Sequence, residues 1–220
     1  MKAITAGLWY WTAPHPDWTP NEPWDQAVTS YAIDDGEQVL LFDPIDPPTE
    51  ILGPTTQRDV VIVLTAPWHE RDTKRLVEQS SATVYSPPPD TAKDLMEKYG
   101  ISAERAGDGS PDLAWLKVED GPEWHPYQAG DRLPFGIEVF PGREHNDLVL
   151  WVEQKASIIT GDTLVDFGNG LEINERWLRD EVSRDSIVEG LQPLLDYPIE
   201  HVLPTHGRPT DRSSLERILS

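Results

Sequence analysis

The stretch VVIVLTAPWHERD (residues 60–72) combines the two features that decide the fold. Its first half is a continuous apolar run, which is typical of a strand that is buried on both faces of a sheet. Its second half is a polar turn that contains His69, Glu70 and Arg71. Buried strands that end in ionisable side chains often position a metal or a catalytic base. The stretch therefore predicts a sheet with a candidate site at the end of this strand.

Three further stretches have the same form, an apolar strand followed by ionisable residues: IEVFPGREHND (137–147), IITGDTL (158–164) and HVLPTHG (201–207). Strand ends that meet at one edge of a sheet bring together residues from distant parts of the chain. The metal-competent side chains among these stretches are His69, Asp162, His206 and, less directly, His145. A loop histidine that bonds only to backbone is also common, so a structural role stays open for each of them.

Strand and helix signals alternate along both halves of the chain. In the first half we expect strands at 27–33, 38–44, 59–65 and 82–86, and helices at 70–80 and 90–100. Residues 101–130 are interpreted as a loop with one strand near LAWLKV (113–118). The second half predicts strands at 137–142, 148–154, 156–162 and 199–207, and helices at 184–197 and 211–220. This pattern predicts an α+β protein, a four-layer αββα sandwich of two mixed β-sheets flanked by helices, in a single domain (1–220).

Composition excludes several classes of function. The 220 residues carry a formal net charge of -21, which repels phosphate backbones, so we expect no nucleic-acid partner. The sequence has no apolar run long enough to cross a membrane and no cysteine, so we expect no membrane partner and no thiolate ligand. Any metal must be held by His, Asp or Glu. The absence of a signal-peptide pattern predicts a cytoplasmic location, and a small molecule or a second copy of the chain remain as partners.

Tryptophan is concentrated near the N-terminus, at Trp9, Trp11, Trp18 and Trp24. Aromatic side chains at this density usually pack in the core or under a long loop. The alternatives are an apolar wall or lid over a cleft, or a dimer contact. Packing is the interpretation we favour.

Four pieces of the chain, in order, resemble the metallo-β-lactamase superfamily. VLLFDP (39–44) is similar to its early strand ending in Asp, and VIVLT (61–65) to the strand before its histidine motif. FPGREHND (140–147) with GDTL (161–164) is similar to its PGH and GD regions, and VLPTHG (202–207) to its last histidine loop. The resemblance implies an αββα sandwich with a metal site along one edge of the sheets. It also implies that Asp162 is the bridging carboxylate and His206 the last histidine ligand.

The chain departs from the family at most of the metal-ligand positions. Family members carry His-x-His-x-Asp-His directly after the strand, and the corresponding positions here are Ala66, Trp68, Glu70 and Arg71. A shift by one residue places His69, Arg71 and Asp72 in the last three positions, and the histidine expected after PG is replaced by Arg143. Alanine and tryptophan offer no ligand, and arginine cannot be deprotonated in a protein. We therefore expect no dinuclear zinc centre, and at most one weakly held divalent metal, zinc before others.

Arginine can replace the missing metal charge. A buried Asp162 without a partner would be costly, and a guanidinium offers a fork that matches a carboxylate. We expect Arg143 to contact Asp162 as a counterion in the cleft, with Arg71 as the next candidate and Glu70 as a second acceptor. The alternative is that both arginines point into solvent, as most arginines do.

Two functions from different classes follow from these residues. The first is a pseudo-enzyme that keeps the fold and a cleft, and binds a small molecule or a partner. The second is a mononuclear metal-dependent hydrolase of an ester, thioester or amide, with His69, Glu70, Asp162 and His206 as catalytic candidates and His145 as a further ligand. A purely structural or oligomerising role has only the tryptophans in its favour. The sequence does not name a substrate.

Overall fold

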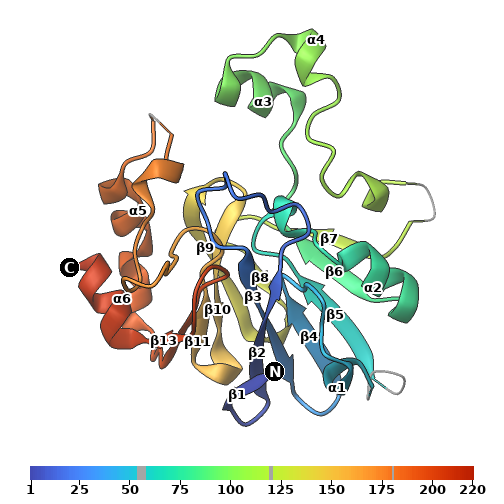
Figure 1. The fold of residues 1–220 in the computed structure, drawn as a ribbon, viewed down its shortest axis with the longest axis vertical. Helices are drawn as coiled ribbons and strands as arrows, with labels where there is room; N and C mark the ends of the chain where they lie inside the picture. The colour runs from blue at the N-terminus through green and yellow to red at the C-terminus, as the bar shows by residue number, and fades with distance from the viewer. Residues whose placement is uncertain (54–57, 119–120, 180) are drawn as a thin grey trace.

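Two mixed β-sheets, one from each half of the chain, face each other in a computed structural model that describes residues 1–53, 58–118, 121–179 and 181–220 (Figure 1). The first sheet has the order β1 (Lys2–Thr5), β2 (Leu8–Pro14), β3 (Ala27–Asp34), β4 (Gln38–Phe42), β5 (Asp59–Val63), β6 (Thr83–Ser86) and β7 (Trp124–Pro126). The second has the order β13 (Thr210–Asp211), β12 (His201–Leu203), β11 (Ser157–Ile159), β10 (Asp147–Val152), β9 (Ile137–Glu144) and β8 (Arg132–Leu133). Strands β4 to β7 pair in parallel, as do β11 and β12, and the remaining neighbours are antiparallel.

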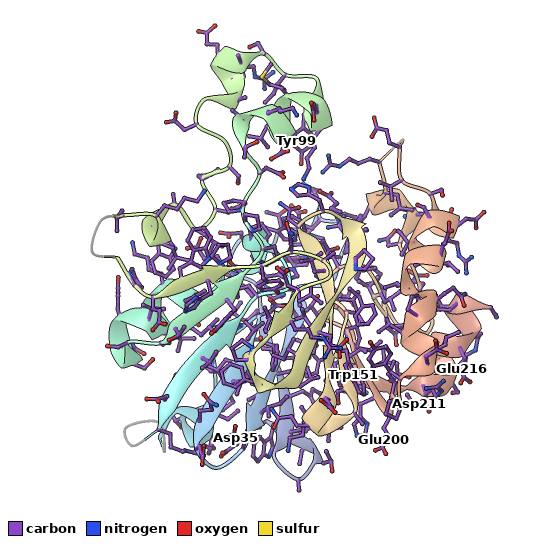
Figure 2. All side chains as sticks on the ribbon, turned by 180° about the vertical axis from the view of Figure 1, so that it is seen from behind. Asp35, Tyr99, Trp151, Glu200, Asp211 and Glu216 are labelled. Atoms are coloured by element: carbon purple, nitrogen blue, oxygen red, sulfur yellow. The ribbon has the colours of Figure 1, made fainter. Side chains whose placement is uncertain are left out.

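Helices cover the outer faces of both sheets, which confirms the predicted αββα layers (Figure 1). The first sheet carries α1 (Thr49–Leu52) and α2 (Thr73–Ser80), and the second carries α5 (Arg184–Leu191) and α6 (Arg212–Leu219). The side chains of Ser183 and Asp211 accept backbone N–H groups and so begin α5 and α6. Helices α3 (Ala92–Tyr99) and α4 (Ala103–Ala106) form a lobe that stands above the sandwich, with the exposed Tyr99 on the side of the lobe that faces the sandwich (Figure 2).

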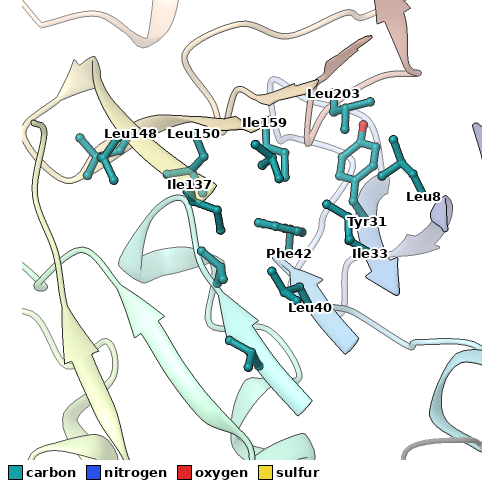
Figure 3. Packing of buried hydrophobic residues seen from close by; sticks show 14 of the residues in the cluster. Leu8, Tyr31, Ile33, Leu40, Phe42, Ile137, Leu148, Leu150, Ile159 and Leu203 are labelled. Carbon is teal, nitrogen blue, oxygen red and sulfur yellow. The ribbon is translucent and has the colours of Figure 1, made fainter. Parts of the chain in front are cut away.

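The main core lies between the two sheets, where buried side chains from both halves meet (Figure 3). Tyr31 and Phe42 from the first sheet face Leu150 and Ile159 from the second. Burying each such side chain contributes about 1.5–3 kcal/mol, so this interface holds the halves together as one body. Two further cores lie under the helices, one outside each sheet, and Trp151 belongs to the one under α5 and α6 (Figure 2).

Strand β5 explains why the run at residues 60–64 is apolar throughout. Val61 and Val63 point into the core between the sheets. Val60, Ile62 and Leu64 point to the opposite face and pack in the core under α2. A strand covered on both faces has no solvent side, so it does not alternate between apolar and polar residues.

Three local predictions need correction. LAWLKV is not a strand, because Ala114–Leu116 forms a single 3-10 turn. The cause is Glu70, which accepts hydrogen bonds from Leu113 N (2.8 Å) and Trp115 Nε1 (2.7 Å) and holds this loop in place of a strand partner. The helix expected from residue 70 begins at Thr73, after a short 3-10 turn at Pro67–His69. The tryptophan-rich N-terminus begins with two strands, β1 and β2, that the sequence pattern did not predict.

Within the described ranges, no helix combines the length and apolar character needed to cross a bilayer.

Candidate functional site

The candidate site lies where strands of both sheets end. Asp43 follows β4, His69 follows β5, and Arg143 lies near the end of β9. Asp162 and His206 follow β11 and β12. The two sheets are joined here by a hydrogen bond of 3.0 Å between their backbones, which Leu148 N donates to Thr65 O. The convergence of strand ends predicted from the sequence is therefore present.

Two glycines allow the backbone to approach closely at this edge. Gly161 has a φ of +54°, and a Cβ there would lie 2.5 Å from an oxygen of the Asp147 carboxylate. A Cβ at Gly142 would lie 2.0 Å from the Asp147 carbonyl oxygen. Any side chain at either position would force the loops apart, so the PG and GD sequences are required by the packing of the site itself.

Asp162 is the centre of the site, and its two oxygens contact different groups. Oδ1 lies 3.2 Å from His69 Nε2 and 3.3 Å from His206 Nε2. Oδ2 accepts hydrogen bonds from Trp68 Nε1 (2.9 Å) and Arg143 Nη2 (3.1 Å). The carboxylate is therefore surrounded by nitrogen atoms, two imidazole nitrogens on one side and two permanent donors on the other.

Arg143 makes the predicted contact with Asp162, and its other nitrogens are also bonded. Nε donates to Asp147 Oδ2 (2.8 Å) and Nη1 donates to the carbonyl oxygen of Trp177 (3.1 Å). The guanidinium lies 5.5 Å from the ring centroids of both Trp68 and Trp177. A guanidinium placed over aromatic rings gains a further electrostatic attraction. Arg143 is thus held from several sides and is not a surface residue.

His69 bridges two buried carboxylates. Its Nδ1 lies 2.9 Å from Thr65 Oγ1 and 3.3 Å from Asp43 Oδ2, opposite the contact of Nε2 with Asp162. Burial disfavours the imidazolium, but the charges of Asp162 and Asp43 outweigh burial and raise the pKa of His69 to about 9. Without a metal, His69 is therefore a cation at neutral pH.

The buried carboxylates respond to these cations in different ways. Burial alone would raise the pKa of Asp162, but the charge of His69 and the hydrogen bonds of His206 and His69 hold it well below its usual value. Burial raises the pKa of Asp147 to about 7, although the neighbouring Arg143 opposes this shift. Asp162 is the fixed anion of the site, whereas Asp147 can take up a proton near neutral pH.

A cavity of about 470 Å³ opens directly onto this cluster, and its volume falls in the range of small-molecule sites. Its walls are largely aromatic and include Trp24, Trp68 and Trp177. The His206 ring contacts Trp24 and Trp177 edge to face, at centroid distances of 5.4 and 5.5 Å. Of the N-terminal tryptophans, Trp24 is therefore a wall of the cleft. Trp11 instead packs in the core, with Nε1 bonded to the carbonyl oxygen of Ile45.

Two of the predicted site residues lie elsewhere. Glu70 turns away from Asp162 to hold the loop at 113–115, so it is not part of the site. His145 lies at the turn between β9 and β10 with a half-exposed side chain, 3.6 Å from Asp90, and it does not join His69, Asp162 and His206. The turn extends past Arg143 and so carries His145 away from the edge where the other strand ends meet.

Comparison with solved structures identifies the fold. The structure of TTHA1623 in a di-iron-bound form is 26% identical, with a TM-score of 0.55, and the match covers 87% of this chain and 93% of that chain. The archaeal metallo-β-lactamase superfamily protein ST1585 from Sulfolobus tokodaii is 17% identical, with a TM-score of 0.63, and the match covers 97% and 84%. The metallo-β-lactamase family protein TTHA1429 from Thermus thermophilus is 16% identical, with a TM-score of 0.60 and coverage of 99% and 79%. This chain has the metallo-β-lactamase fold. No protein-family model and no curated protein matches the sequence.

The donor atoms fit one metal in this metallo-β-lactamase fold, and they do not fit two. Nε2 of His69 and Nε2 of His206 lie 3.2 and 3.3 Å from Asp162 Oδ1. Ligands held at tetrahedral angles around zinc are roughly 3.3 Å apart, because each Zn–N or Zn–O bond is about 2.0–2.1 Å. Asp43 supports the same interpretation, since it holds the outer nitrogen of His69 as a carboxylate commonly does for a metal ligand. On the Oδ2 side, Trp68 and Arg143 occupy the carboxylate and neither can bind a metal.

Sequence reasoning did not single out Asp43, Asp147 or Trp177 as members of this site. Asp147 could have been found from the sequence, because it is an acidic residue directly before the apolar run LVLWV. The other candidate residues instead follow an apolar run. Asp43 in LLFDP directly follows an apolar run, which is the pattern that marked the other candidate residues. Trp177 ends a single 3-10 turn (Glu175–Trp177) that has no periodic sequence pattern, and nothing in the sequence marked it.

Proposed function

We propose that this chain is a pseudo-enzyme of the metallo-β-lactamase fold that binds a small molecule in its aromatic cleft and holds no dinuclear metal centre. One observation carries this proposal. The Arg143 guanidinium lies against Asp162 and Asp147 and between two tryptophans, so a fixed cation takes the place of a metal. The cavity beside it supports the binding role, since it is concave and combines three tryptophan walls with a cluster of charged and polar side chains.

A second function is favoured by a different observation. The nitrogens of His69 and His206 converge on one oxygen of Asp162 at separations that suit a tetrahedral metal. A divalent metal there would supply Lewis acidity to the carbonyl of an ester, thioester or amide. In that case Asp43 would orient His69, and Trp24 and Trp177 would exclude water around His206.

Metal content separates the two functions. Protein purified without chelator is analysed for zinc, manganese and iron, and is then titrated with zinc and manganese in a calorimeter. The pseudo-enzyme predicts well below one metal per chain and only weak binding on titration. One tightly held metal that is lost in His206→Ala would favour the mononuclear hydrolase, which should then cleave a chromogenic ester or thioester. Two tightly held metals would contradict both functions.

A further inference from the structure

Arg71 is a cation in the cleft that donates to neutral groups. Its Nη1 donates to the main-chain carbonyls of Asp43 (2.7 Å) and Thr29 (3.3 Å). Its Nε is buried and has no hydrogen-bond partner in the part of the chain that the structure describes. Among the same described residues, no carboxylate forms an ion pair with it. Arg71 nevertheless belongs to the lining of the cavity, as do His69 and Trp24.

The nearby carboxylates are already engaged by other groups. Asp43 accepts from Thr65 N (2.8 Å) and Thr65 Oγ1 (2.7 Å), and it also contacts His69. Asp162 is surrounded by its own four nitrogen contacts. Burial accordingly lowers the pKa of Arg71, even though the more distant charges of Asp43 and Asp162 oppose the shift. A buried charge without a partner is costly, so the site is more favourable when an anion lies against Arg71.

The backbone presents Arg71 in a fixed and strained conformation. Its φ is 43°, in the left-handed region that a residue with a Cβ adopts only at an energetic cost. The next residue is tied down, because Asp72 N donates to the carbonyl oxygen of Pro44 (3.2 Å). Strain of this kind persists where the surroundings enforce it, and it is concentrated at ligand sites. Arg71 is therefore a preorganised group in the lining of the cavity.

We propose that Arg71 anchors the carboxylate of a small organic acid whose flat apolar body lies against the tryptophan walls. This inference rests on the proposed small-molecule function and names the chemical class of the ligand. Trp24, Trp68 and Trp177 provide the apolar surface, and the cavity of about 470 Å³ suits a molecule of one or two rings. Glu22 at the cavity and the net charge of -21 disfavour a ligand with several negative charges, so the ligand is a monocarboxylate.

The test compares aromatic acids with their primary amides, which have the same shape and no charge. The pairs are benzoate and benzamide, 2-naphthoate and 2-naphthamide, and indole-3-acetate and indole-3-acetamide, at pH 7.5. Binding is followed by the indole N–H signals of ¹⁵N-tryptophan-labelled protein, with Trp68→Phe used to assign the Trp68 signal. Arg71→Gln removes the charge, and Arg71→Lys keeps the charge without the fork. Arg132→Gln is the control, because Arg132 is an exposed arginine paired with Glu138.

We expect each acid to bind the parent protein at least about tenfold more tightly than its amide, as charge-assisted hydrogen bonds require. In Arg71→Gln the acid should bind no more tightly than the amide, while the amide itself binds as it does to the parent. Arg71→Lys should retain part of the difference, and Arg132→Gln all of it. Equal binding of acids and amides to the parent would overturn the role of Arg71 and leave the small-molecule function standing. If no probe shifts the cavity tryptophans at millimolar concentration, both proposals are wrong.

Discussion

Replacing Arg143 should be among the most destabilising single changes in this chain. The side chain is only 12% exposed, and it is the shared counterion of Asp147 and Asp162, which are 0% and 8% exposed. Arg143→Ala removes the bonds of 2.8 and 3.1 Å to these carboxylates and the bond of 3.1 Å to Trp177 O. Both acids would then remain buried, with Asp162 still near His69 and Asp147 deprived of its nearest cation.

The cost follows from the loss of one partner of a buried ion pair, which is typically about 3–5 kcal/mol. Protonation of Asp147 limits how much stability the variant can lose. A buried carboxylate without a cation beside it takes up a proton and becomes neutral, which avoids the rest of the cost of the buried charge. Burial already raises its pKa to about 7, and removal of Arg143 raises it further. The loss of stability should therefore be larger at pH 8 than at pH 6, where Asp147 is largely protonated in both proteins. For a chain of this size, about 3–5 kcal/mol corresponds to a fall in Tm of roughly 6–20 °C.

The assay is urea unfolding followed by circular dichroism at pH 6 and pH 8, in the presence of a chelator. Arg143→Met keeps the length of the side chain and isolates the charge from the packing. Arg143→Lys keeps the charge but cannot reach all three acceptors, so it should fall between the parent and Arg143→Met. Arg132→Ala, on an exposed pair with Glu138, should change stability by no more than about 1 kcal/mol.

Two results would refute this reasoning. The first is a free energy of unfolding of Arg143→Ala at pH 8 that differs from the parent by no more than that of the Arg132→Ala control. The second is a loss of stability that is the same at pH 6 and pH 8, because it would mean that Asp147 does not respond to Arg143.

Three further predictions concern the metal, the histidine and the lobe. The double variant Trp68→His, Arg143→His places two imidazoles beside Asp162 Oδ2, where the indole and guanidinium donors now lie at 2.9 and 3.1 Å. Calorimetry should show that this variant binds zinc at least about tenfold more tightly than the parent. The pKa of His69 is raised to about 9, so the stability that its charge contributes is fully present below pH 6.5 and is lost as the pH rises to 9. In chelator, the free energy of unfolding of the parent in urea should therefore fall by up to about 3 kcal/mol over that range. His69→Gln should not show this fall. Lys98→Met breaks the ion pairs of 2.5 and 2.8 Å that Lys98 on α3 makes with Asp90 and Glu144. Limited proteolysis should therefore cut the lobe at residues 87–113 several-fold faster in this variant than in the parent. Lys93→Met, on the same helix, should leave the rate of cleavage unchanged.

Each of these predictions has a contrary result. Unchanged zinc affinity in the double variant would mean that the Oδ2 side of Asp162 cannot be rebuilt by ligands alone. A decline of stability with pH that is equal in His69→Gln and the parent would place the titrating group elsewhere. Equal proteolysis of the two lysine variants would show that the lobe is held by contacts other than the Lys98 ion pairs.

The layers of the fold could be predicted because the sequence signals were local and agreed with one another. The apolar run before Thr65 required a strand covered on both faces, and β5 has core on both sides. The helices expected at 184–197 and 211–220 also begin at local signals, since Ser183 and Asp211 accept N–H groups of the first turns of α5 and α6. LAWLKV was misread because its conformation depends on Glu70, more than 40 residues earlier, and no local pattern encodes that contact. The N-terminal strands were missed because tryptophan density does not distinguish a strand from a packed loop.

The site residues that directly follow strands could be predicted from the sequence, whereas the directions of side chains on the neighbouring turns could not. Asp162, His206 and Arg143 follow from strand ends, because a strand fixes the position of the residue that follows it. His145 differs from Arg143 by only two residues, yet it lies beyond the edge on an exposed turn. Whether a side chain at a strand end points inward or outward depends on turn geometry. Arg71, with its φ of 43°, is a further case, since its direction comes from a backbone conformation that the sequence does not signal.

From the charges of the site we expect any single metal to be held weakly. Asp43, Asp147 and Asp162 face the cations Arg71, Arg143 and His69, so the cluster is close to neutral without a metal. A metal on His69 must first displace the proton from Nε2, which is now held by Asp162. With a pKa of about 9, that displacement costs about two pH units at pH 7, which is roughly a hundredfold in affinity. Arg143 adds repulsion from the other side of Asp162. We therefore expect the same residues to make the cleft a poor competitor for zinc and to leave Arg71 able to meet an anion instead.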